Sequence, residues 1–194
     1  MDNRTSQLIR FFVEKFPGCG RAQIVKSLYL ADLEARRCLG RAITSLNYIV
    51  YDGGPFDSDI LAELDRMESG GLLKVDRRAE NGMVLLRYLP TEGKCPNTFS
   101  EEEDYILTHV AEVIRSAVAS SSLDDLIAQS KPMTDARQRD GFGCRLRMEL
   151  VDNEAIIPGL ELTKILQSMR DLAAGKGRPL KEIMAAIRDK VPSA

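Results

Sequence analysis

The chain has 194 residues, of which 44% are hydrophobic and 29% charged, and this length is sufficient for one well-packed core. Its 27 basic and 29 acidic side chains give a formal net charge of -2, so charge alone draws it neither to nucleic acid nor to an anionic membrane. No apolar run approaches the ~20 residues that span a bilayer, and the first residues lack the features of a signal peptide. We therefore expect a cytoplasmic protein with no membrane partner.

The residue types that usually bind metals or perform catalysis are sparse and scattered. Cys19, Cys38, Cys95 and Cys144 form no close pair of the kind that zinc and redox motifs need, and reduced thiols are expected in the cytosol. The only histidine, His109, falls on the apolar side of a predicted helix, which favours packing over general-base catalysis. No dinucleotide fingerprint, phosphate loop or nucleophile elbow is present. The sequence predicts no enzyme, no metal and no cofactor, and an unfamiliar catalytic activity is the weakest of the alternatives.

The first elements in chain order are two predicted helices. Apolar residues spaced along one face predict a helix up to residue 16, with Phe11, Phe12 and Phe16 in the core, and the Pro-Gly pair that follows ends it. A second predicted helix covers about residues 21 to 39 and stops at Gly40. Residues 42–51, rich in β-branched and aromatic types, then favour a short extended segment.

A glycine-proline corner at residues 53–55 separates this segment from a third helix. Asp57 or Ser58 can cap that helix, and Gly70-Gly71 closes it. Residues 72–89 then read as two strands around Asn81-Gly82, a residue pair that tolerates the positive φ angles of a tight hairpin turn.

The second half of the chain continues with helices and one strand. Ser100 and Glu103 have the spacing of a capping box, which predicts a helix behind them, and a short helix is expected after Ser122. The polar residues 130–143 read as a loop, and alternating apolar and charged residues at 145–150 predict a half-buried strand that could join the hairpin. Apolar spacing at 162–172 and 180–187 predicts two last helices.

Together these elements predict an α+β fold that is predominantly helical, with a winged-helix-like arrangement of helices and a small antiparallel hairpin. We expect one domain at residues 1–135 and a C-terminal extension at 136–194 that packs on the same core. In a DNA-binding winged helix the helix before the hairpin enters the major groove. Here residues 57–69 carry five acidic side chains against Arg66 alone, which disfavours base recognition by that helix. A DNA-binding transcriptional regulator that uses the hairpin and residues 21–39, as a homodimer through its C-terminal helices, is the alternative.

Residues 24–67 also carry a recognisable pattern. Lys26 and Tyr29 lead into Leu30-Ala31-Asp32 on a predicted helix, and Gly40–Thr44, Tyr48 and the Gly54-Pro55 corner follow in order. This order and spacing resembles the Panacea, or SocA-like, antitoxin domain family, and the similarity extends to about residue 130. The resemblance implies an antitoxin that neutralises a cognate toxin by direct binding, with the toxin encoded alongside. It is also compatible with an adaptor role, since one member of the family presents its toxin to a cytoplasmic protease.

The candidate protein-binding residues lie at the glycine-proline corner and in the helical part of the family pattern. They are Tyr29, Asp32, Tyr51, Pro55 and Phe56. A corner of this kind lies at a surface, where aromatic side chains can act as buried anchors of an interface. Core packing is the competing interpretation for Tyr29, Tyr51 and Phe56, and for Tyr29 it is the favoured one. Asp32 could instead cap a helix or pair with Arg36 one turn later.

Overall fold

The computed structural model describes residues 3–52, 54–80, 82–92, 98–119, 122–139, 141–150, 171 and 174–176. The chain divides into two compact units, Met1–Gly159 and Leu160–Ala194, and the elements below belong to the first. The helices predicted at 162–172 and 180–187 fall almost entirely outside the described residues. The domain boundary expected at 135/136 stays a prediction.

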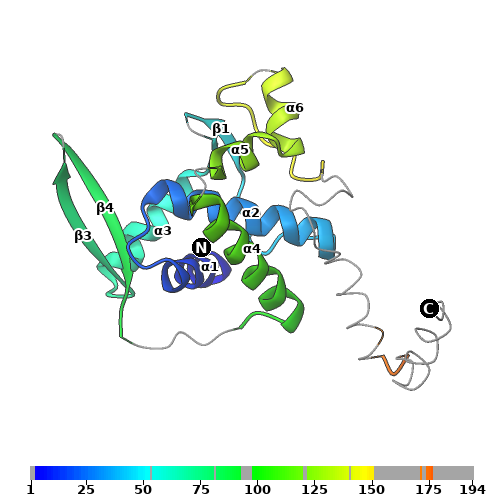
Figure 1. The fold of residues 1–194 in the computed structure, drawn as a ribbon, viewed down its shortest axis with the longest axis horizontal. Coiled ribbons are helices and arrows are strands. Elements are labelled where there is room, and N and C mark those ends of the chain that lie inside the picture. Colours follow the sequence, from blue (N-terminus) through cyan, green and yellow to red (C-terminus); the bar gives the residue numbers. More distant parts are fainter. Residues whose placement is uncertain are drawn as a thin grey trace, which may run out of the picture. The chain divides into compact units, whose positions relative to one another are not determined.

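The described part of the first unit is predominantly helical, which confirms the predicted α+β class (Figure 1). Its helices are α1 (Asn3–Lys15), α2 (Arg21–Leu39), α3 (Ser58–Ser69), α4 (Glu101–Ala119), α5 (Leu123–Ala128) and α6 (Lys131–Arg139). Its strands form two separate antiparallel pairs, β1 (Ile49–Tyr51) with β2 (Gly54–Phe56) and β3 (Leu73–Glu80) with β4 (Met83–Pro90).

Helix α2 is the centre of the core. It contacts α1, α4, β2 and β4 (Figure 1), and Ile24, Leu28 and Ala35 along it are fully buried. A helix that packs against neighbours on several sides is apolar over much of its circumference. It ends as predicted at Gly40, whose φ of 72° is a left-handed conformation that glycine adopts without steric cost.

Helices α3 and α4 begin where local capping signals predict. Asp57 caps α3 because its side chain accepts a hydrogen bond from the Asp59 amide at 2.9 Å. Ser100 and Glu103 form the predicted capping box before α4, since each side chain accepts from the other residue's backbone amide. In α1 Phe12 is fully buried, whereas Phe11 and Phe16 are only half-buried, so the expectation that all three phenylalanines lie in the core was too broad.

The predicted hairpin is formed by β3 and β4, in a register that pairs Leu73 with Pro90 and Glu80 with Met83. Gly82 has a φ of 76°, as a tight turn requires, and Asn81 lies outside the described residues. The base of the hairpin is joined to the α1–α2 connection by two backbone hydrogen bonds, from the Gly18 amide to the Tyr88 carbonyl and from the Tyr88 amide to the Cys19 carbonyl.

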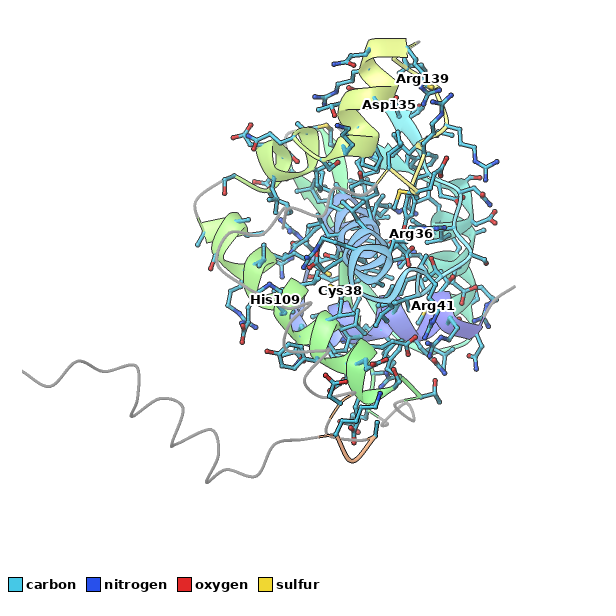
Figure 2. All side chains as sticks on the ribbon, turned by 90° about the vertical axis from the view of Figure 1, so that its right-hand side faces the viewer. Arg36, Cys38, Arg41, His109, Asp135 and Arg139 are labelled. Atoms are coloured by element: carbon cyan, nitrogen blue, oxygen red, sulfur yellow. The ribbon has the colours of Figure 1, made fainter. Side chains whose placement is uncertain are left out.

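The structure of residues 130–150 differs from two predictions. Helix α6 occupies most of the segment predicted as a loop, because Pro132 is tolerated in a first helical turn and Asp135 pairs with Arg139 one turn later (Figure 2). Residues 145–150 form no strand and do not join the hairpin; Arg145 makes one isolated bridge to Ile49 of β1 instead. The apolar alternation there is real, because Leu146 and Met148 are buried beneath exposed neighbours.

Candidate protein-binding surface

Two of the candidate residues, Tyr29 and Asp32, have buried side chains on α2. Tyr29 is 0% exposed, its hydroxyl lies 2.6 Å from Ser130 Oγ, and its ring packs edge-on against Tyr48. Ser130 in turn donates to the Ile127 carbonyl, so the Tyr29 hydroxyl is the donor in the first bond. This chain of bonds attaches α5 and the start of α6 to the core, and a role of Tyr29 in contacting a partner stays a prediction.

Asp32 organises the segment between α2 and β1. Its carboxylate is 1% exposed and accepts four hydrogen bonds, whose donors are the Ile43 and Thr44 amides, the Thr44 hydroxyl and the Tyr48 hydroxyl. Burial raises the pKa of Asp32, and these hydrogen bonds partly oppose that rise because they favour the charged form. The side chain therefore bonds to residues 43–48 and not to Arg36, which corrects the predicted pairing one turn along the helix.

The remaining candidates lie on the β1–β2 corner, where the structure also places Phe142. The Tyr51 ring centroid is 5.0 Å from that of Phe56 and 5.1 Å from that of Phe142. Tyr51 is 47% exposed, Phe142 is 69% exposed and Phe56 is half-buried, whereas Pro55 is buried opposite Val50. We call Tyr51, Phe56 and Phe142 the aromatic patch.

Backbone hydrogen bonds hold the Phe142 loop against β1. The Gly143 amide donates to the Val50 carbonyl at 2.7 Å, and the Val50 amide donates to the Cys144 carbonyl at 2.8 Å. Gly141 and Gly143 have φ angles of 70° and 78°, so a glycine on each side of Phe142 takes a conformation that other residues adopt at a cost. The loop therefore turns tightly and presents one large aromatic side chain beside Tyr51.

The other side of the corner is fixed by Asp57, the residue that caps α3. It is buried, and its second carboxylate oxygen accepts from the Asn47 amide at 2.6 Å. One side chain thus joins the start of α3 to the segment just before β1. Because both flanks of the corner are held by hydrogen bonds, little conformational freedom would be lost when the aromatic patch binds a partner.

The acidic side chains of α3 are largely paired with neighbouring arginines. Glu63 is buried and bonds to Arg66 and to Ser6, and the Arg66 hydrogen bond, opposed by burial, lowers the pKa of its carboxyl group. Arg77 of β3 makes two bonds to Glu68, and Arg21 lies 3.4 Å from Asp65. Two of the basic residues that the DNA-binding alternative would use are thus engaged by carboxylates of α3. No observation favours that alternative.

Other classes of site find no support among the described residues. They contain no cluster of histidine, cysteine and carboxylate side chains suited to a metal ion. Within the same part of the chain no helix has the length and apolar character to cross a membrane. His109 is 7% exposed on α4, and its Nε2 makes no hydrogen bond in the described structure (Figure 2).

Sequence reasoning located the glycine-proline corner but missed Phe142. The signal that could have found it is the Gly-Phe-Gly triplet at 141–143, since an aromatic between two turn glycines in a polar stretch is seldom a core residue. The contact between Phe142 and Tyr51 joins segments about 90 residues apart, and no local pattern encodes it.

Comparison with known proteins gives one match. The family model described as "Antitoxin SocA-like, Panacea domain" matches residues 24–132, more than half of the chain. The matched region begins within α2, includes both strand pairs and ends within α6, and therefore contains Tyr51 and Phe56 but not Phe142. No curated protein and no solved structure matches the chain.

Proposed function

Because the chain belongs to the SocA-like, Panacea-domain antitoxin family, we propose that it neutralises a cognate toxin by binding it directly, with the aromatic patch at the centre of the interface. An antitoxin-type role follows from the family. The toxin as partner, and the surface that binds it, are what we add.

The aromatic patch is the observation that supports this surface. Exposed aromatic rings gathered in one place are unusual on a monomeric surface and often mark a protein interface. Tyrosine and phenylalanine bury much apolar area for few rotatable bonds, and interfaces are enriched in such residues at their energetic centres. The patch also lies on a corner whose backbone is already held by hydrogen bonds at Val50 and Asn47.

Growth rescue provides the first test. The toxin-like product encoded beside this chain is expressed with and without it, and we expect growth to stop only in its absence. Purified proteins then give the dissociation constant by calorimetry. Phe142→Asp and Tyr51→Asp should each weaken binding by about 30-fold or more, which corresponds to about 2 kcal/mol for a charge placed in a desolvated aromatic contact.

The matched control is Met83→Asp at the tip of the β3–β4 hairpin, where the native side chain is 64% exposed. All three substitutions put a carboxylate at an exposed apolar position, so they are matched in chemistry. A melting temperature equal to that of the wild type would show that each variant is folded. We expect Met83→Asp to bind like the wild type. Loss of binding in Met83→Asp together with normal binding in both patch variants would place the interface on the hairpin and reject the patch.

Toxin lifetime separates simple neutralisation from delivery to a protease, the adaptor role that the resemblance implies. If the chain only occupies the toxin, co-expression should restore growth, and the half-life of the toxin, measured in a parallel culture after translation is blocked, should stay unchanged. An adaptor would shorten the toxin's half-life in a manner that depends on a cytoplasmic protease. Measuring the toxin by immunoblot during co-expression distinguishes these outcomes.

A further inference from the structure

A pocket with a volume of about 400 Å3 lies on the first unit, and none of its lining residues belongs to the aromatic patch. Its charged lining comes from Arg36 of α2, Arg139 of α6 and the segment that follows α6. The polar and charged side chains that line it are Arg36, Asn47, Arg139, Arg145, Arg147 and Glu149. We call the four arginines the pocket arginines.

Tertiary contacts bring these arginines together from separate parts of the chain. The Leu146 amide donates to the Tyr48 carbonyl at 2.8 Å and places residues 145–149 beside the segment just before β1. Arg139 Nη2 donates to the Arg145 carbonyl at 3.0 Å, and Arg145 Nη2 donates to Asn47 Oδ1 at 2.5 Å. The pocket walls are therefore bonded to one another, as in a preformed ligand site.

The charge balance of the pocket is strongly positive. Four arginines and one carboxylate residue, Glu149, line the pocket, and Arg139 Nε also donates to Asp135 at 2.9 Å. Like charges gathered in a concave, partly desolvated space repel one another and raise the local potential. An anion would relieve that repulsion, and it would be attracted to this opening more strongly than to a flat surface.

Arg36 adds an independent observation. Its Nε is buried and makes no hydrogen bond in the part of the chain that the structure describes. A buried donor without an acceptor is unfavourable and rare in folded proteins, particularly when the donor group is charged. Figure 2 shows Arg36 on α2, the helix that also carries the fully buried Tyr29 and Asp32, so this part of its backbone is rigidly placed.

We propose that this pocket binds a small phosphate-bearing anion, of the size of a pyrophosphate or a nucleotide. Planar guanidinium forks match the oxygen geometry of phosphate and bind it in a bidentate manner. The excess of three positive charges among the lining residues is more than one carboxylate can neutralise, which favours a multiply charged phosphate over an acidic protein side chain. The volume lies in the range of small-molecule sites, which is about 300–1,000 Å3. The pocket shares no lining residue with the aromatic patch, so an anion could bind here whether or not the patch binds a toxin.

Titration calorimetry with pyrophosphate and with ADP tests the proposal on the full chain. We expect saturable binding of one equivalent that persists at about 0.3 M salt, where diffuse surface attraction is screened. Tighter binding of ADP than of pyrophosphate would identify a nucleotide site, and equal affinities would identify a phosphate site; both support the proposal.

Three substitutions make the test specific. Arg36→Gln and Arg147→Gln should each weaken pyrophosphate binding by at least about 10-fold, because each removes one charged contact of the kind that phosphate prefers. Arg137→Gln is the matched control, since Arg137 is an exposed arginine of α6 outside the pocket lining, and its affinity should stay within about twofold. Arg147 is exposed, so its variant remains informative if Arg36→Gln fails to fold.

Several results would overturn the proposal. Absence of pyrophosphate and ADP binding at millimolar concentrations would do so directly. If all three substitutions weakened pyrophosphate binding equally, the binding would depend on general surface charge and not on the pocket. Binding of an acidic peptide or of DNA at these residues, with no response to pyrophosphate, would assign the pocket to a macromolecule instead.

Discussion

Replacing Asp32 with alanine is expected to destabilise the protein strongly while leaving its surface unchanged. The carboxylate accepts hydrogen bonds from two backbone amides and two hydroxyls, and Asp32 and Tyr48 are each only 1% exposed. In Asp32→Ala the Ile43 and Thr44 amides and the Tyr48 hydroxyl lose their acceptor where water has little access. Each buried donor left unsatisfied costs about 1–3 kcal/mol, so we expect the free energy of unfolding to fall by about 3–5 kcal/mol.

Urea denaturation followed by circular dichroism measures this difference, and Tyr48→Phe is the internal control. That variant removes one donor and leaves the carboxylate with its other partners, so its expected cost is about 1–1.5 kcal/mol. In the double variant the Tyr48 contribution should largely vanish, because its acceptor is already gone. A loss below about 1 kcal/mol in Asp32→Ala, or full additivity in the double variant, would refute the role assigned to Asp32.

The remaining predictions concern single ionisable side chains. Burial alone would raise the pKa of Glu103, but hydrogen bonds from Arg4, the Ser100 amide and Arg41 outweigh it and lower that pKa below its usual 4.5. A lowered folded-state pKa adds stability above pH 4.5, and this stability is lost as the pH falls. In Glu103→Gln the free energy of unfolding, measured by urea denaturation between pH 3 and 6, should therefore fall less steeply with decreasing pH than in the wild type. The same pH dependence in both proteins would contradict this assignment. Burial raises the pKa of Cys19 to about 11, so at pH 8 only about one Cys19 thiol in a thousand is ionised. Iodoacetamide should therefore label Cys144 well before Cys19, as followed by peptide mass spectrometry. Equal labelling rates would show that Cys19 is accessible. Because the buried Nε2 of His109 has no hydrogen-bond partner in the described structure, His109→Leu should keep or raise the melting temperature, and a marked fall would reveal a polar contact of the ring.

Local signals predicted those parts of the fold that local chemistry controls. Gly40 ends α2, Asp57 begins α3, and the reciprocal bonds of Ser100 and Glu103 begin α4, each within a few residues of sequence. Helix α6 escaped prediction because its polar residues gave little apolar periodicity, and its support comes from the Asp135–Arg139 pair and the packing of a few buried side chains.

Only part of the candidate surface could be predicted from the sequence. The glycine-proline corner marked Tyr51 and Phe56 correctly as neighbours of a turn, but burial depends on the whole core, so Tyr29 and Asp32 could not be placed from α2 alone. The contact of Phe142 with Tyr51 depends on the loop after α6 lying beside β1, which is a tertiary arrangement.

Residues 47–51, which run into and through β1, contribute to two different surfaces. Asn47 and Tyr48 line the arginine pocket, and Tyr51, three residues beyond Tyr48, belongs to the aromatic patch. If an anion binds at residues 47–48 and a partner binds at Tyr51, any change that one ligand causes in the affinity of the other must be returned by the same factor.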